Sequence, residues 1–292
     1  MHQANQWRLA LGEEIGSVYA EEAKVTAVFL HGSTAYGSAD RFSDIELAVC
    51  WSEPPSEDEL AAIAVRAGGT SWKLSSFSYS ETLKAWAEEY YVRGVKIDTG
   101  QWTTATLEQV LADVVMNGDA SLMKQNTVSV ILHCIPIYGE EIIRSWQEEA
   151  GNYPIALAVA MVMDHLPSGS FGGQEMLAQR NEIPLLYQNH CHRIRQILGI
   201  LMGINRIYYP GHKWTQQLTS EMSIVPTDLF ARLEKVFRLN AIAGTQELRD
   251  LTLDTFDLVE AHLPDVNVSA RREEFMSPYQ SWDEGVSESD TG

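Results

Sequence analysis

The stretch HGSTAYGSADRFSDIELAVC, residues 31–50, decides which fold this chain adopts. It follows KVTAVFL (24–30), whose β-branched and aromatic residues predict a strand. If a helix begins at Gly32-Ser33, free backbone N–H groups meet the strand end there, and such a position suits an anion. Gly32 would let a phosphate approach the backbone, and the Ser33 hydroxyl would add a donor. A tight turn before a surface strand is the alternative interpretation.

The second half of this stretch places two carboxylates together. DIELAVCW (44–51) alternates and predicts a strand, so Asp44 and Glu46 leave from the same face while Ile45 and Leu47 face the core. Two adjacent carboxylates repel each other unless a cation neutralises them. Hard oxygen ligands of this kind suit Mg²⁺, which also bridges nucleotide phosphates. A solvated strand face is the alternative.

A third carboxylate follows in VKIDTGQW (95–102), which also predicts a strand. Alternation places Lys96, Asp98 and Gly100 on the face opposite the core. If this strand lies beside residues 44–51, Asp98 joins Asp44 and Glu46. Three carboxylates and a Gly-Ser anion site together form the apparatus of metal-dependent nucleotidyl transfer, in which positioning lowers the barrier.

The order hydrophobic-Gly-Ser, a spacer and Asp-hydrophobic-Glu resembles the signature of the DNA polymerase beta-like nucleotidyltransferase superfamily. Residues 31–50 look most like the antibiotic nucleotidyltransferases of the kanamycin and lincosamide type, with weaker similarity at 133–146 and 197–209. The resemblance implies that Gly32 and Ser33 bind the nucleoside triphosphate and that Asp44 and Glu46 ligate Mg²⁺. It also implies a helical C-terminal domain that contacts the acceptor, often across a homodimer.

The sequence departs from the kanamycin enzymes at the general base. Those enzymes use a glutamate on an early helix of the second domain, whereas PIALAVAMVMDHL (154–166) contains none. We therefore expect Asp98 to be the base and a third metal ligand, with Asp164, His165 and Glu182 as the alternatives. Lys213, the last residue of a basic region that begins at Arg193, is the candidate for a triphosphate contact from the helical domain.

The pattern along the chain predicts an α+β protein with an N-terminal mixed-sheet nucleotidyltransferase domain followed by an all-helical domain. We expect the catalytic domain at 1–104, a helical acceptor-binding domain at 105–276 and a disordered acidic tail at 277–292. Within the first domain the sequence also predicts a helix over 2–22, a helix capped by Ser56 and Glu59, a strand at 72–79 and a helix near 80–91. The tryptophans are expected to lie in the core.

Composition bounds the partners of this 292-residue chain. A formal net charge of −19 argues against a nucleic-acid partner, because phosphate backbones need basic surfaces. The same charge would attract a cationic small molecule, although solubility alone also explains it. The chain lacks a stretch of 18 uncharged apolar residues, a signal-peptide pattern and an even set of cysteines. We therefore expect a cytoplasmic protein without a membrane segment or disulfides.

Together these patterns predict a Mg²⁺-dependent enzyme that transfers a nucleoside monophosphate, AMP from ATP, to a hydroxyl of a small molecule such as an antibiotic and releases pyrophosphate. A protein-modifying, antitoxin-type nucleotidyltransferase acting on a partner protein is the alternative. A module that holds nucleotide without turnover is a third, which the intact Gly32-Ser33 and Asp44-Ile45-Glu46 disfavour.

Overall fold

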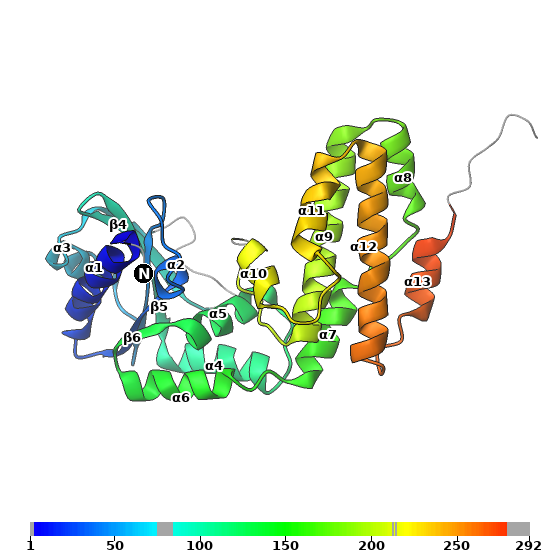
Figure 1. The fold of residues 1–292 in the computed structure, drawn as a ribbon. Coiled ribbons are helices and arrows are strands. Elements are labelled where there is room, and N and C mark those ends of the chain that lie inside the picture. Colours follow the sequence, from blue (N-terminus) through cyan, green and yellow to red (C-terminus); the bar gives the residue numbers. More distant parts are fainter. Residues whose placement is uncertain (1–2, 75–83, 212, 214, 279–292) are drawn as a thin grey trace, which may run out of the picture. The chain divides into compact units, whose positions relative to one another are not determined.

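The computed structural model describes residues 3–74, 84–211, 213 and 215–278, and the chain divides into two compact units. The first unit runs to Leu157 and includes the short segment Tyr208–Gly211, and the second begins at Ala158 (Figure 1). The first unit contains a β-sheet with helices, so the predicted α+β class is confirmed.

A six-stranded sheet forms the centre of the first unit, in the order β3-β4-β5-β2-β1-β6. Among the described strands, β2 and β5 run parallel and the other four pairings are antiparallel, so the predicted mixed sheet is confirmed. The strands are β1 (Val25–His31), β2 (Ile45–Trp51), β3 (Thr70–Leu74), β4 (Trp86–Val92), β5 (Val95–Thr103) and β6 (Ile135–Tyr138).

Helices α1 (Gln3–Ala20) and α3 (Glu57–Arg66) pack on one face of this sheet and bury the apolar side of β1, β2 and β5. The predicted capping box at the start of α3 is present: the Ser56 hydroxyl accepts from the Glu59 N–H, and the Glu59 carboxylate accepts from the Ser56 N–H. The α1 side chain of Arg8 also donates to the Ser43 carbonyl at 2.9 Å. This bond anchors the loop that leads into β2.

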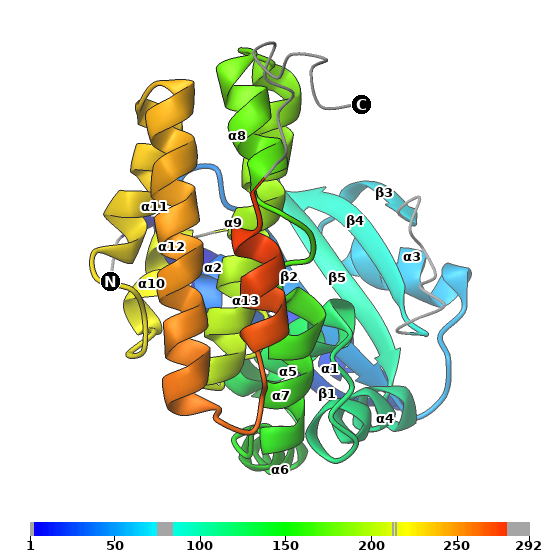
Figure 2. The same ribbon diagram turned by 90° about the vertical axis from the view of Figure 1, so that its right-hand side faces the viewer.

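The first unit extends beyond residue 104, where the sequence alone predicts a domain boundary. Three helices after that residue belong to it, α4 (Thr104–Val115), α5 (Leu122–His133) and α6 (Glu140–Ala150), and they lie beside the sheet in Figure 2. The sixth strand, β6, also follows residue 104 and pairs with β1. Sequence reasoning missed β6 because it is a four-residue edge strand that contains Pro136.

The helix predicted near 80–91 is wrong where the structure describes it. Residues 75–83 lie outside the described part, and Trp86–Val92 form strand β4 between β3 and β5. Tyr90 and Val92 point into the core as an alternating strand requires, but Glu88 occupies a position on the same buried face. A glutamate at that position breaks the apolar alternation, and the sequence therefore looks helical.

Glu88 is 1% exposed and accepts hydrogen bonds from four side chains. Its Oε1 accepts from the Tyr19 hydroxyl at 2.5 Å, the Thr99 hydroxyl at 2.8 Å and the Gln101 amide at 3.0 Å. Its Oε2 accepts from the Trp72 indole at 2.5 Å. Burial raises the pKa of Glu88, against the effect of these donors. The carboxyl therefore ties α1, β3 and β5 to β4.

Glu88→Ala is expected to lower the free energy of unfolding by about 3 kcal/mol, because it leaves several buried donors without an acceptor. Chemical denaturation followed by circular dichroism measures this change. Glu89→Ala, one residue along on the opposite face of β4, is the matched control and is expected to cost less, because Glu89 has ion pairs with Lys73 and Lys96 and, among the described residues, no buried donor that depends on it. Equal effects of the two variants would contradict the structural role of Glu88.

The second unit consists of helices in its described part, as the sequence predicts for the C-terminal half. Helices α9, α11 and α12 pack against one another, and α8 contacts α9 and α12. The helices are α7 (Ile155–His165, which begins in the first unit), α8 (Gly172–Gln179), α9 (Ile183–Asn205), α10 (Thr215–Glu221), α11 (Leu229–Arg238), α12 (Ala241–His262) and α13 (Ser269–Met276). The tail predicted at 277–292 lies outside the described residues, except for Ser277 and Pro278.

None of the helices among the described residues combines the length and the apolar character that crossing a bilayer requires.

Candidate functional site

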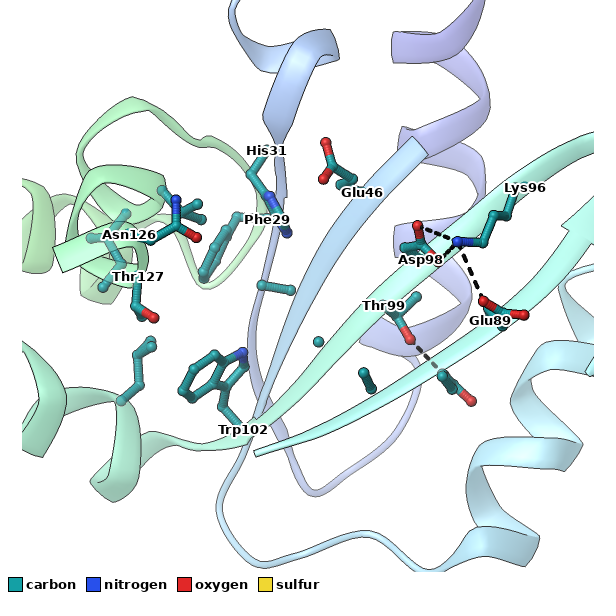
Figure 3. Close-up of a pocket in the computed structure, with 17 residues that line it drawn as sticks. Phe29, His31, Glu46, Glu89, Lys96, Asp98, Thr99, Trp102, Asn126 and Thr127 are labelled. Atoms are coloured by element: carbon teal, nitrogen blue, oxygen red, sulfur yellow. Dashed lines mark hydrogen bonds and ion pairs between the residues drawn. The ribbon is translucent and has the colours of Figure 1, made fainter. Parts of the chain in front are cut away.

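Strand register brings acidic side chains from three strands into one row. Glu46 on β2 pairs with Asp98 on the parallel strand β5, and Asp98 pairs with Glu89 on β4. His31, the last residue of β1, pairs with Glu46 from the other side. Paired residues share a face, so this row of His31, Glu46, Asp98 and Glu89 crosses the sheet face opposite α1 and α3 (Figure 3).

The turn at Gly32 packs directly against the Glu46 carboxylate. Gly32 begins the four-residue helix α2 (Gly32–Ala35) with φ +64°, in the left-handed region. A Cβ at this position would lie 1.6 Å from Oε2 of Glu46. The backbone of the predicted anion site and the predicted metal ligand are therefore in contact, and only glycine fits between them.

The predicted strand begins at Asp44, but β2 begins at Ile45, so Asp44 lies one residue before the strand. The Arg8–Ser43 hydrogen bond anchors the chain beside it. Burial and the nearby Asp44 carboxyl raise the pKa of Asp98, so these two carboxyls are neighbours. Glu46 and Asp98 are therefore paired across the sheet and Asp44 lies near Asp98, and the roles of all three in catalysis and metal binding stay predictions.

Lys96 compensates part of the negative charge of this row. Its Nζ lies 2.7 Å from Oδ1 of Asp98 and 3.3 Å from Oε2 of Glu89 (Figure 3). Burial acts to lower the pKa of Lys96, but Asp98 and Glu89 outweigh it and raise this pKa, so the side chain stays cationic at neutral pH. Asp98 has a raised pKa, because burial and Asp44 outweigh the opposing effect of Lys96.

The donor chemistry of this place fits Mg²⁺. Three carboxylates are hard oxygen ligands, and Asp44 and Asp98 in contact repel each other when both are ionised, a conflict that a divalent cation relieves. Within residues 3–74, 84–211, 213 and 215–278, no group of three or more His, Cys, Asp or Glu side chains is arranged so that it could hold a metal ion. Asp98 is instead bonded to Lys96, and binding of a cation by all three carboxylates would replace that ion pair.

A pocket of about 410 Å³ opens beside the acidic row, on the same face of the sheet. Glu46, Asp98, Glu89, Lys96 and His31 line its charged end (Figure 3). Its remaining lining is mostly apolar and comes from β1, β2, β4, β5, α4 and α5: Phe29, Ala48, Ala87, Glu88, Thr99, Gly100, Trp102, Leu107, Asn126, Thr127, Val130 and Ile131. The pocket therefore combines a charged end with an apolar interior.

The remaining predicted site residues belong to the second unit. Lys213 lies there, and so do the alternative bases Asp164, His165 and Glu182. His165 uses Nδ1 to bond the Met161 carbonyl at 2.8 Å within α7. The contact of Lys213 with a triphosphate stays a prediction.

Sequence reasoning missed the pocket residues beyond the acidic row. Trp102, which was expected to lie only in the core, is 9% exposed and also lines the pocket. The spacing Asp98-x-Gly100-x-Trp102 could have predicted that Trp102 lies at the site, because the three residues share one face of β5. Glu89 and Asn126 carry no such signal, since β4 was predicted to be helical and α5 lies far along the chain.

Comparisons with known proteins find a matching family model and similar solved structures. A family model described as a domain of unknown function (DUF4037) matches residues 121–215, which begin before α5 and extend beyond α9. No curated protein matches the chain significantly. Among solved structures, a nucleotidyltransferase-like protein from Exiguobacterium sibiricum 255-15 matches with 12% identity and a TM-score of 0.38, covering 86% of this chain and 74% of its own. A likeness this distant assigns no activity by itself.

Proposed function

We propose that this protein is a Mg²⁺-dependent nucleotidyltransferase that transfers AMP from ATP to a hydroxyl of a small acceptor, such as an antibiotic, and releases pyrophosphate. One observation carries the proposal: Glu46 and Asp98 pair on one sheet face, Asp44 lies near Asp98 just before β2, and the Gly32 turn packs on Glu46. A turn that exposes backbone N–H groups beside three carboxylates pairs an anion site with a cation site, which is the requirement for binding a metal–triphosphate.

Each residue has a distinct task in this reaction. Gly32 and Ser33 bind the β- and γ-phosphates, and Asp44 and Glu46, with Asp98, hold Mg²⁺, which neutralises charge on the phosphates when bound. The acceptor hydroxyl oxygen forms a bond to the α-phosphorus, the bond from that phosphorus to the bridging oxygen breaks, and pyrophosphate leaves. Asp98 takes the hydroxyl proton, because its carboxylate lies beside the reacting phosphate.

The charge of the chain supports a cationic acceptor. With a formal net charge of −19, the protein attracts cations and repels free polyanions, so the triphosphate needs both the metal and local cations. Lys213 is proposed as one of these cations. Acceptor contacts are assigned to the second unit, within a cytoplasmic homodimer, on the resemblance described above.

A turnover assay with product masses tests the proposal. The protein is incubated with Mg²⁺, each nucleoside triphosphate in turn and a panel of aminoglycoside and lincosamide antibiotics, and pyrophosphate and acceptor masses are measured. We expect ATP-dependent pyrophosphate release together with one acceptor that gains AMP. AMP on a protein in an added lysate, with no modified small molecule, would favour the protein-modifying alternative. Tight nucleotide binding without pyrophosphate release under any condition would refute the enzymatic proposal.

Mg²⁺ is expected to tighten ATP binding by at least about tenfold, which corresponds to about 1.4 kcal/mol. The reason is that Asp44 and Glu46 repel a bare triphosphate and a divalent cation converts this repulsion into attraction. Isothermal titration with Mg²⁺ and with EDTA measures the difference.

Glu46→Gln should abolish this Mg²⁺ dependence, whereas Glu140→Gln, the same change at an exposed glutamate paired with Arg144, should preserve it. Equal affinity for ATP in Mg²⁺ and in EDTA would rule out the metal site.

A further inference from the structure

Three small residues beside the acidic row leave a hollow on this face of the sheet. Ala48 on β2 pairs with Gly100 on β5, and Gly100 pairs with Ala87 on β4. This row lies two residues along the strands from Glu46 and Asp98, a step of about 7 Å. Because side chains at these three positions are short or absent, α4 and α5 do not fill the space above them, and the pocket of about 410 Å³ remains.

Trp102 forms the far wall of this hollow. It lies on the same face of β5, two residues beyond Gly100. A Cβ on Gly100 would stand 3.0 Å from the indole Nε1, so the edge of the ring that carries Nε1 lies against the glycine. Phe29, which pairs with Ala48, and Ile131 of α5 supply further apolar walls of the pocket. Aromatic walls around a narrow apolar space favour a flat aromatic ligand.

Two polar groups face this apolar space from α5. Asn126 and Thr127 line the pocket together with Phe29 and Trp102 (Figure 3). The Thr127 hydroxyl makes a long bond of 3.4 Å to the Met123 carbonyl, and the Asn126 amide makes no hydrogen bond within the described part of the chain. An amide offers one donor and one acceptor side by side, and adenine presents the same pair at N6 and N7.

We propose that this pocket binds the base of the donor nucleotide, a purine and by preference adenine, which stacks on Trp102 while Asn126 hydrogen-bonds its edge. The inference rests on the proposed function and adds the subsite that selects the nucleotide. Stacking supplies affinity for any base, and the Asn126 amide supplies the preference.

The order of the rows along the strands supports the base over the acceptor as the occupant. Gly32 lies at one end, the row of Glu46 and Asp98 comes next, and the small row and Trp102 follow. A nucleotide runs from its γ-phosphate through the α-phosphate to its base in the same order. A cationic, hydroxyl-rich acceptor would leave its polar groups unpaired against Phe29 and Trp102.

Binding of three probes tests the inference: Mg²⁺-ATP, Mg²⁺-UTP and Mg²⁺-tripolyphosphate, which has no base, measured by calorimetry on the full chain. We expect the wild type to prefer ATP to UTP and both to tripolyphosphate. Trp102→Leu should weaken ATP binding about tenfold and leave tripolyphosphate binding within twofold. Asn126→Ala should reduce the ratio of the affinity for ATP to the affinity for UTP. Trp7→Leu, the same replacement at a half-exposed tryptophan of α1, is the matched control and should change neither.

A second variant addresses the risk that removing Trp102 disturbs the fold. Ala48→Leu fills the hollow and should exclude ATP while tripolyphosphate still binds, which also shows that the charged end is intact. Equal loss of ATP and tripolyphosphate in Trp102→Leu, or ATP binding unchanged in both variants, would overturn the inference. If the wild type binds ATP and tripolyphosphate and these variants leave ATP binding unaffected, the proposed function stands and the base binds elsewhere. If the wild type binds neither ATP nor tripolyphosphate, the proposed function fails and this inference fails with it.

Discussion

Asp98→Asn is expected to fold normally, bind nucleotide and lose on the order of 10²-fold or more in turnover, as removal of a general base does. Asn keeps the shape of the side chain and can still accept from Lys96, which retains Glu89 as its second partner. What the variant loses is the negative oxygen that takes the proton of the acceptor hydroxyl. Single-turnover kinetics at saturating ATP measures the chemical step apart from binding.

The matched control is Asp113→Asn. Asp113 lies in α4 of the same unit, 2.8 Å from the Lys124 ammonium, and Lys124 keeps Asp119 as its second partner. The control thus repeats the loss of one carboxylate from a lysine bonded to two carboxylates, away from the acidic row. Turnover of Asp113→Asn should stay within a few-fold of the parent. If Asp98→Asn does the same, Asp98 is structural, and Asp164, His165 and Glu182 become the bases to replace next.

Gly32→Ala is expected to reduce turnover by about 10²-fold, the scale on which loss of a metal ligand's support acts. The added Cβ would stand 1.6 Å from Oε2 of Glu46, so the carboxylate must leave its present position. The Mg²⁺ requirement of ATP binding should weaken in parallel, and titration of Mg²⁺ at fixed ATP measures that change.

The control variant Gly37→Ala introduces the same kind of backbone strain as Gly32→Ala but no contact with Glu46. Gly37 also has a positive φ, +73°, but a Cβ there meets nothing within 4 Å. Both substitutions cost about 1 kcal/mol of stability for a left-handed alanine, and that common cost is read from denaturation curves. Turnover should fall in Gly32→Ala alone. Similar turnover in the two variants would show that Glu46 can move without harm, and its assignment as a metal ligand would be wrong.

The acidic row shows what local sequence predicts well. Alternation along a strand has a period of two, so one strand alone states which residues share a face. Alternation places Asp44 and Glu46 on one face, and separately Lys96, Asp98 and Gly100. The structure places the second set so and pairs Glu46 with Asp98, whereas Asp44 lies one residue before β2. The parallel neighbour relation of β2 and β5 was a condition of that prediction. It is a tertiary fact, supplied by the sheet order.

Other elements escaped prediction for identifiable reasons. Strand β4 looked helical because its inward position 88 is a glutamate, whose burial depends on donors from α1, β3 and β5. Strand β6 was not predicted because a four-residue segment with a proline has a weak strand pattern. It forms a strand by pairing with β1 at the edge of the sheet. In both cases the stabilising partner lies far along the chain, where local patterns carry no information.

The sequence by itself determined the Gly32-Ser33 turn, the acidic faces of two strands and the α+β class, because each depends on residues close together in the chain. The tertiary structure alone decided that Gly32 touches Glu46, that Lys96 bridges Asp98 and Glu89, and that Ala48, Gly100 and Ala87 form one hollow row. It also decided that Asn126 of α5 and Trp102 of β5 line one pocket. These contacts depend on strand register and helix packing, which are set by the burial of the whole core.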